Sequence, residues 1–344
     1  AESRRYRLDR TYCRKENAPF LSAAGVFTHG GCGAHAQAIM MNFAELTPPD
    51  YVKYRPYFKD QCYELCAYSL SSAISWKNDR YHSLAAEYNN MLLIAAEFYV
   101  GSSNRYLLLP VSFGKKTPPH ELVTIAELSG YTEFSFVPES YVTHFGEDEI
   151  LRHFKIMPQG AYDDYVYRVT DLAELKGNRY SKKRNLIHQF VRDYVDLGRV
   201  SIEPISAANT DACLEFLEEW CIERSCDAED QVDLACEKQA AANTLTHYDA
   251  FDLTGILLRI DGKVSAFGIS APLTPDMATL QYEKAIESIK GLYQYFDNAC
   301  ARMLFSGYTW LNKESDMGIP GLEKAKRSYH PERMIRSMRL VLKG

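Results

Sequence analysis

Several features that would assign a function at once are missing from this sequence. No apolar run approaches the roughly 18 residues of a membrane-spanning helix, since Met91–Ala96 has only the length of a strand. We also find no signal peptide in this sequence. The chain begins at Ala1 without a methionine, so whether a targeting segment precedes Ala1 stays open. No nucleophile elbow supports a Ser/His/Asp triad. We therefore expect a cytoplasmic protein with no transmembrane segment.

A strong excess of charge is also missing. The net charge is -6 and the isoelectric point is about 5.9, so the chain as a whole does not attract polyanions. Any contact with a nucleic acid must use a local basic patch.

Cysteine occurs nine times, an odd number with irregular spacing, which favours free thiols in a reducing compartment. Cys62 and Cys66 form one group that resembles a metal site, and His29, Cys32 and His35 form another. Neither has the paired CxxC or HxxxH spacing that a metal site requires, so we predict no metal.

At 344 residues the chain is long for a single core, and we expect two domains. Residues 1–45 are predicted to be an N-terminal extension, residues 46–165 a first domain, and residues 166–344 a second domain that carries the site. Hydrophobic periodicity in the first domain predicts a helix over 61–76, strands over 90–98 and 105–113, a helix over 118–129, a strand over 133–137 and mostly helix over 139–154.

A second cycle in the same order begins near Val166. Its clearest element is a hairpin whose strands are joined by Asp261-Gly262, a pair that suits a type I′ turn. The predicted elements are helices over 211–223 and 229–247, hairpin strands over 254–260 and 263–269, a strand over 277–283, a helix over 292–304, a strand over 308–311, a helix over 321–329 and a strand over 333–342. This order is that of the GNAT (Gcn5-related N-acetyltransferase) fold. We therefore predict an α/β protein with mixed sheets and two tandem acyl-CoA N-acyltransferase (GNAT)-like domains.

Between Leu46 and the C-terminus, several segments resemble the C-terminal catalytic domain family of phosphatidylglycerol lysyltransferases. They are Ser75-Trp76, the strand at 92–94, Leu109-Pro110, GNRYSKKRNLIHQF at 177–190, Glu283-Lys284-Ala285, Gly291-Leu292-Tyr293-Gln294, Asn312 to Gly318, Gly321-Leu322 and Lys324-Ala325-Lys326. The resemblance implies tandem GNAT-like domains and transfer of an aminoacyl or acyl group to an amine or hydroxyl. The known lysyltransferases take lysine from charged tRNA and give it to a lipid headgroup. The implied partners are an aminoacyl-tRNA donor and a small-molecule, peptide or lipid-headgroup acceptor.

This sequence departs from such enzymes in two ways. It does not contain the membrane-embedded half of the lipid enzymes, which argues against a phospholipid acceptor. It also has no R/Q-x-x-G-x-G/A loop of the kind that holds the pyrophosphate of coenzyme A, since the matching stretch, Ala285 to Gly291, has the single glycine Gly291. No cofactor is certain, and coenzyme A stays open with Gly291 as its candidate contact.

Three residues are candidates for catalysis. Glu283 ends an apolar strand and is placed to act as a general base or to bind an amine, with an ordinary strand-end ion pair as the alternative. Asp316 is a second candidate base, and a helix cap is its alternative. Asn312 is placed to donate to a developing oxyanion, or else to hold its own loop.

Six further residues are candidates for substrate binding. Two groups of basic residues, around Lys182 and around Lys324, would form a surface for a tRNA acceptor stem if they converge, and solvated helix faces are the alternative. The candidates are Glu314, Tyr293, Gln294, Lys324, Lys326 and Arg184.

Three functions remain. The leading hypothesis is an aminoacyl or acyl transferase. The alternatives are an acetyl-CoA-dependent N-acetyltransferase and a non-catalytic module that binds tRNA, a peptide or a nucleotide.

Overall fold

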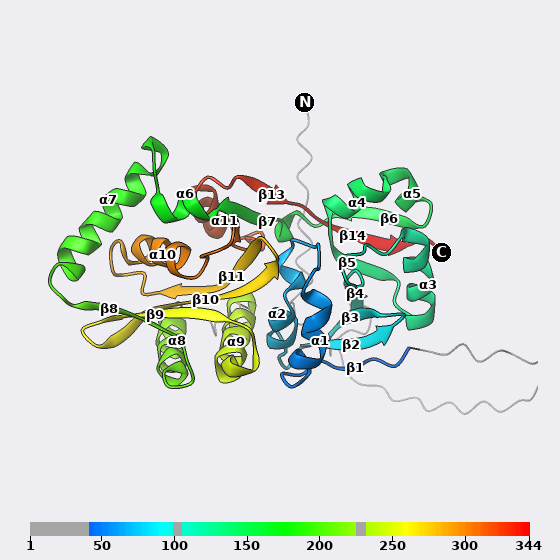
Figure 1. Cartoon of the computed structure of the whole chain (residues 1–344), viewed down its shortest axis with the longest axis horizontal. Helices are drawn as coiled ribbons and strands as arrows, with labels where there is room; N and C mark the ends of the chain where they lie inside the picture. The colour runs from blue at the N-terminus through cyan, green and yellow to red at the C-terminus, as the bar shows by residue number, and fades with distance from the viewer. Residues whose placement is uncertain (1–40, 99–104, 225–231) are drawn as a thin grey trace, which may run out of the picture.

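The computed structural model describes residues 41–98, 105–224 and 232–344, so most of the predicted extension lies outside the described residues. Two mixed sheets of seven strands form the described part of the chain (Figure 1). The first sheet has the order β1-β2-β3-β4-β5-β14-β6, and the second has the order β13-β7-β12-β11-β10-β9-β8. In the described strands, each sheet contains one parallel pair, β4 with β5 and β11 with β12.

The bounds of the elements are as follows. The first sheet contains β1 (Ala44–Glu45), β2 (Tyr81–Tyr88), β3 (Met91–Phe98), β4 (Arg105–Leu107), β5 (Glu133–Pro138), β6 (Phe154–Pro158) and β14 (Ser337–Leu342), with helices α1 (Asp50–Phe58), α2 (Leu70–Ser75), α3 (Pro119–Ser129), α4 (Glu139–Phe145) and α5 (Glu147–Leu151). The second contains β7 (Asp164–Arg168), β8 (Val200–Pro204), β9 (Thr254–Ile260), β10 (Lys263–Thr274), β11 (Met277–Ala285), β12 (Trp310–Asn312) and β13 (Arg333–Ile335), with helices α6 (Val169–Glu174), α7 (Ser181–Phe190), α8 (Thr210–Arg224), α9 (Val232–Thr246), α10 (Leu292–Met303) and α11 (Pro320–Arg327).

Both halves of the chain follow one order of elements. Each half contains, in this order, a strand, two helices, three antiparallel strands and a helix. A strand parallel to the third antiparallel strand comes next, and further helix and a last strand complete the half. This is the order of the GNAT fold, and the predicted fold class is confirmed. In the second half, α8 and α9 cover one face of the sheet and α10 lies on the other, with a separate apolar core under each layer (Figure 1).

The two sheets exchange one strand each. β7 lies between β12 and β13 in the second sheet, whereas β14 lies between β5 and β6 in the first. The single strand predicted over 333–342 is therefore wrong, because the chain leaves one sheet at Ile335 and enters the other at Ser337. The predicted domain boundary between residues 165 and 166 stays a prediction, and β7 spans that position.

Local sequence explains most, but not all, of these elements. The hairpin at Asp261-Gly262 is confirmed, and both residues have positive φ, 51° and 84°. The strands predicted over 90–98 and 105–113 do pair antiparallel, as β3 and β4, although β4 ends at Leu107. The strand before them, β2, was not predicted, and it joins β3 through a turn at Asn89-Asn90, with φ of 48° and 61°. The helix predicted over 61–76 is short, since only Leu70–Ser75 is α-helical after a 3₁₀ turn at Cys66–Tyr68.

Candidate active site

The parallel strands β11 and β12 separate in the middle of the second sheet. They pair from Met277 with Trp310 to Thr279 with Asn312. Beyond this point β11 continues to Ala285, whereas the chain after Asn312 turns away toward α11. The separation leaves an opening in the sheet, and Glu283 on β11 and Lys313 after β12 lie on its two sides.

An ion-paired cluster closes this opening. The Lys313 ammonium group lies 2.9 Å from Glu283 Oε2 and 2.8 Å from Oδ1 of Asp297, which is on α10. The side chains of Glu283, Lys313 and Asp297 are 14%, 12% and 4% exposed, so the cluster is largely buried but Glu283 still reaches solvent. Three separate elements thus hold one cation between two carboxylates.

Burial and the neighbouring charges change the proton affinities of this cluster. Burial, together with the negative charge of Asp297, raises the pKa of Glu283 to about 7, while Lys313 opposes the rise. Burial works to lower the pKa of Lys313, but Asp297 and Glu283 outweigh it and the pKa is raised, so the ammonium form persists. A carboxylate with a pKa near neutrality is suited to accept and return a proton.

Helix α7 and the end of α11 lie beside this cluster. Lys183 donates to Ser328 Oγ at 2.7 Å, and its ammonium group lies 3.8 Å from the centre of the Tyr329 ring. Lys313 lies 5.3 Å from the same ring centre. Burial lowers the pKa of Lys183. The two predicted basic groups therefore meet where Lys183 contacts Ser328 and Tyr329.

Asn312 is fully engaged in holding the end of β12. Its amide nitrogen donates to Asp164 Oδ2 at 2.8 Å and to the carbonyl oxygen of Glu64 at 2.9 Å. Its amide oxygen accepts from the backbone N–H of Glu314 at 2.6 Å. The side chain is completely buried and both amide hydrogens have acceptors, which is the loop-holding arrangement rather than that of a free oxyanion donor.

Two of the predicted residues shape the loop that follows. The Lys326 ammonium group donates to the carbonyl oxygens of Lys313, Glu314 and Ser315, and burial lowers its pKa. Glu314 has a positive φ of 59° and accepts from Thr279 Oγ1 at 3.4 Å. Burial raises the pKa of Glu314 to about 8, against the attraction of Lys326. Lys326 thus points inward and is not part of a surface for tRNA.

Asp316 lies in the turn before α11. One oxygen accepts from the Tyr165 hydroxyl at 2.5 Å, and the other accepts from the backbone N–H of Gly318 at 2.8 Å. Asp316 is 9% exposed, and neither ion pair of Lys313 involves it. Its contacts hold the turn, and its predicted catalytic role stays a prediction.

The other predicted residues lie around the cluster. Arg184 donates to the carbonyl oxygens of Leu175 and Gly177, so it holds the loop before α7. Tyr293 and Gln294 are partly buried in the first turn of α10, and Lys324 is exposed on α11.

Gly291 precedes α10 with a φ of 85°. A Cβ atom at this position would lie 2.3 Å from the carbonyl oxygen of Leu186 on α7, which no real contact allows. The close approach of α7 therefore requires a glycine here without any cofactor, and contact of Gly291 with coenzyme A stays a prediction.

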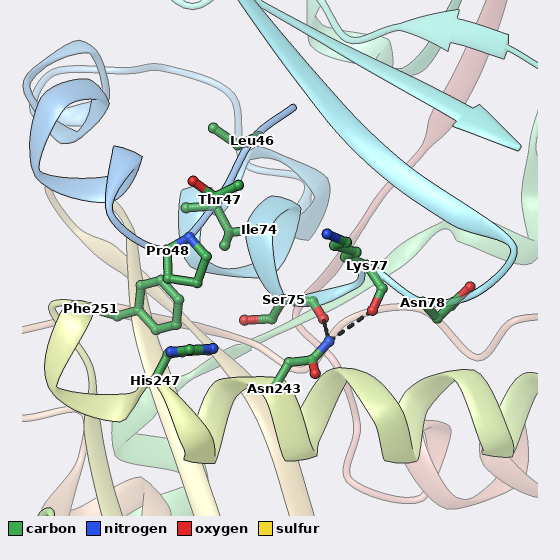
Figure 2. A pocket seen from close by; sticks show the side chains of 10 residues that line it. All are labelled: Leu46, Thr47, Pro48, Ile74, Ser75, Lys77, Asn78, Asn243, His247 and Phe251. Atoms are coloured by element: carbon green, nitrogen blue, oxygen red, sulfur yellow. Dashed lines mark hydrogen bonds between the residues drawn. The ribbon is translucent and has the colours of Figure 1, made fainter. Parts of the chain in front are cut away.

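Two pockets lie where the first domain meets the second, and neither is lined by Glu283. One has a volume of about 310 Å³ and lies between α2 and α9 (Figure 2). The other has about 470 Å³ and lies between α1 and the β10–β11 hairpin.

Within the described residues, no group of three or more His, Cys, Asp and Glu side chains is arranged to hold a metal ion. Cys62 and Cys66 are free thiols, whereas His29, Cys32 and His35 lie outside the described residues. No helix in the described part of the chain is long and apolar enough to cross a membrane.

Comparison with known proteins agrees with this architecture. A family model described as phosphatidylglycerol lysyltransferase, C-terminal, matches residues 121–338. The chain belongs to this family. The match begins within α3 and includes the opening between β11 and β12 with its charged cluster.

Two solved structures share this fold. A conserved protein of unknown function from Bacteroides thetaiotaomicron is 27% identical and superimposes with a TM-score of 0.78, covering 88% of this chain and all of the other. A domain named as the C-terminal domain (DUF2156) of a lysylphosphatidylglycerol synthetase from Agrobacterium fabrum is 15% identical with a TM-score of 0.55, covering 82% of this chain and 89% of the other.

A curated relative, the uncharacterized protein MYCGA3080 of Mycoplasmoides gallisepticum, is 26% identical over 177 residues, which are 50% of this chain. The match spans about half of the relative's length, 54%.

Sequence reasoning missed three members of the charged surroundings. Lys313 lies between Asn312 and Glu314, which were both predicted as site residues. Asp164 lies in a strand that was not predicted. Asp297 had a visible signal, because it falls on the same helical face as the buried residues Cys300, Ala301 and Leu304. An acidic residue in an apolar stripe indicates a buried charge that needs a partner.

Proposed function

We propose that this protein is an aminoacyltransferase that moves an activated aminoacyl group from aminoacyl-tRNA to an amine or hydroxyl acceptor. The observation that carries the proposal is the Glu283 carboxylate, which has a pKa of about 7 and is fixed by Lys313 at the opening of the second sheet. Membership of the lysyltransferase family supports the choice of donor.

Glu283 acts as the general base in this reaction. As the acceptor nitrogen or oxygen attacks the ester carbonyl carbon, its proton passes to the carboxylate. The new bond forms while the carbonyl electrons move to the oxygen. When the intermediate collapses, the bond to the tRNA ribose breaks and the ribose oxygen takes the proton from Glu283. The Lys313 ammonium group offsets the negative charge that develops beside it.

The basic surface supports tRNA as the source of the aminoacyl group. Lys182 on α7 and Lys324 on α11 are both exposed. The Lys183–Ser328 contact joins the start of α7 to the end of α11, and we propose that Lys182 and Lys324 contribute to one basic surface there. Such a surface can contact phosphates near the acceptor end of tRNA.

The test is a transfer assay with tRNA charged with radiolabelled lysine. The acceptors are phosphatidylglycerol vesicles, a mixture of free amino acids, and a peptide with a free N-terminus. We expect a labelled product with one of them, and Glu283→Gln is expected to lower turnover at least about a hundredfold while the protein stays folded.

Glu287→Gln is the matched control, because Glu287 is four residues further along and 64% exposed. Equal turnover of Glu283→Gln and the native chain would remove Glu283 from its role. Acetyl transfer from radiolabelled acetyl-CoA in place of aminoacyl transfer would make the protein an N-acetyltransferase. Binding of tRNA with no product from either donor would make it a binding module.

A further inference from the structure

A second lysine lies beside the charged cluster and takes no part in the proposed proton transfer. The Lys183 ammonium group is 3.8 Å from the centre of the Tyr329 ring, and the Lys313 ammonium group is 5.3 Å from the same centre. Burial lowers the pKa of Lys183, and the negative charges of Asp297 and Glu283 oppose this change. Helix α7 therefore brings another positive charge to the opening at which Glu283 lies.

The two lysines differ in their partners. Lys313 lies between two carboxylates, at 2.9 Å and 2.8 Å, so its charge is already compensated. Within the described residues, Lys183 pairs with no carboxylate and donates to one neutral hydroxyl, that of Ser328, at 2.7 Å. An ammonium group has three N–H donors. Because Lys183 is only partly buried, it keeps a donor and an uncompensated charge for a group that enters the opening.

This arrangement has an energetic cost. A charge that is withdrawn from water without a counterion destabilises the folded protein, and burial of Lys183 has this effect. A negative charge that forms at the opening would supply the missing counterion. The tetrahedral intermediate of acyl transfer carries such a charge on its oxygen, and fixed donors aimed at this oxygen are a principal source of catalysis.

The donor expected from the sequence is occupied elsewhere. Both amide hydrogens of Asn312 have acceptors, the carboxylate of Asp164 and the carbonyl oxygen of Glu64. Asn312 is also completely buried, so it has no surface for a substrate. Lys183 has the free donor capacity that Asn312 lacks.

We propose that Lys183 is the catalytic residue that stabilises the oxyanion of the transfer reaction, an inference that rests on the proposed function. As the acceptor attacks the ester carbon, its proton passes to Glu283, and the carbonyl electrons move to the oxygen, which accepts a hydrogen bond from Lys183. The C=O bond then re-forms, the bond to the ribose oxygen breaks, and this oxygen takes the proton from Glu283. Lys183 gives up no proton. Lys313 stays bound to its two carboxylates.

The first test is the transfer assay with tRNA charged with radiolabelled lysine. Lys183→Met is expected to lower kcat about a hundredfold and to change the KM for charged tRNA by no more than about threefold, because the hydrogen bond strengthens only in the transition state. Lys183→Arg keeps a charged donor and should retain at least about a tenth of kcat.

Two control variants separate this role from a structural one. Ser328→Ala breaks the same contact between α7 and α11 but leaves the ammonium group, so kcat should fall by no more than about tenfold. Lys176→Met removes a lysine that is 79% exposed and paired with Glu174, and it should change neither constant. A loss of kcat in Ser328→Ala as large as that in Lys183→Met overturns the proposal.

The second test is calorimetric titration with the adenosine 3′-ester of the phosphonate analogue of lysine, in which an anionic tetrahedral phosphorus replaces the carbonyl carbon. Lys183→Met should bind it at least about tenfold more weakly than the native chain does. The neutral, planar 3′-amide of lysine and adenosine should bind both proteins equally.

The outcomes distinguish the role of Lys183 from the proposed function. Transfer by the native chain with an unchanged kcat in Lys183→Met overturns the role of Lys183 alone. Failure of the native chain to bind the phosphonate, or an equal effect of the substitution on the phosphonate and the amide, overturns that role as well. Absence of transfer by the native chain to every acceptor overturns the proposed function and the role of Lys183 with it.

Discussion

Lys313 and Glu283 form an ion pair across the opening between β12 and β11, with 2.9 Å between Nζ and Oε2. The base and its counterion therefore come from two strands that have already separated. Because Lys313 immediately follows β12, anything that moves the loop after this strand changes the proton affinity of Glu283.

The rate of transfer should depend on pH through Glu283. Its pKa is raised to about 7, and a general base works only when it is deprotonated. We expect the rate under saturating donor to rise about tenfold per pH unit below 7 and to level off above it, in a profile measured between pH 5.5 and 8.5. A rate that is flat across this range would contradict the role of Glu283 as base.

Replacing Lys313 with methionine should destabilise the protein in a pH-dependent way. The change leaves the buried carboxylates of Glu283 and Asp297 without their shared cation. We expect the free energy of unfolding, measured with urea, to fall by roughly 3–5 kcal/mol at pH 8. The loss should be smaller at pH 5, where Glu283, with its raised pKa, is protonated and neutral.

Lys324→Met is the matched control for this change, because Lys324 is exposed. It should alter the free energy of unfolding by no more than about 0.5 kcal/mol. An equal loss of stability at pH 8 and pH 5 in Lys313→Met would show that Lys313 acts by packing rather than by its charge.

Replacing Asn312 with aspartate should reveal the role of this side chain as a structural donor. The Asn312 amide lies 2.8 Å from Asp164 Oδ2, and an aspartate would bring two buried carboxylates together. We expect a loss of roughly 3 kcal/mol in unfolding free energy at pH 8 and partial recovery at pH 5. Asn185→Asp is the control, since Asn185 is exposed on α7 and an aspartate there stays hydrated. An equal pH response of both variants would contradict this account.

The sequence predicted the parts of the fold that local chemistry determines. The turn at Asp261-Gly262 requires two positive φ angles, and only a few residue types adopt them readily. The strand exchange could not be predicted in this way. Nothing near Ser337 distinguishes a strand that continues in one sheet from one that crosses to the other, because the partners of β14 are the distant strands β5 and β6.

In the candidate site as well, some residues were predicted from local signals and others are positioned only by the fold. Glu283 was predicted from its place at the end of an apolar strand, which is a local signal. The inward direction of the Lys326 side chain was not predicted, because a lysine with basic neighbours on a short helix resembles any exposed lysine. Only the fold of residues 313–315 around its ammonium group gives Lys326 its three carbonyl partners.

Replacing Gly291 with alanine should destabilise the contact between α7 and α10. Both a positive φ of 85° and a carbonyl oxygen 2.3 Å from the new Cβ oppose the change, and we expect a loss of roughly 2–5 kcal/mol in unfolding free energy. Gly262→Ala separates the two causes, because Gly262 has nearly the same φ, 84°, but open space around it. That control should lose only about 1–3 kcal/mol. A greater loss in Gly262→Ala than in Gly291→Ala would contradict the steric explanation.

Binding of tRNA should depend on the surface where α7 meets α11. Replacing both Lys182 and Lys324 with alanine removes two exposed positive charges from this surface, whereas Arg184 and Lys326 are engaged by carbonyl oxygens. Each lost phosphate contact should lower the slope of log affinity against log salt by about 0.7–0.9, so we expect a reduction of up to about 2 and a weaker affinity at low salt. Filter binding of tRNA between about 50 and 200 mM KCl measures both quantities.

The control for this double variant is Lys155→Ala, which removes an exposed charge from β6 in the first sheet. Its salt dependence should match that of the native chain, because β6 belongs to the other half of the molecule (Figure 1). An unchanged slope in the double variant, or the same change in Lys155→Ala, would show that tRNA does not use this surface. The source of the aminoacyl group would then have to be sought elsewhere, even if Glu283 proves essential for transfer.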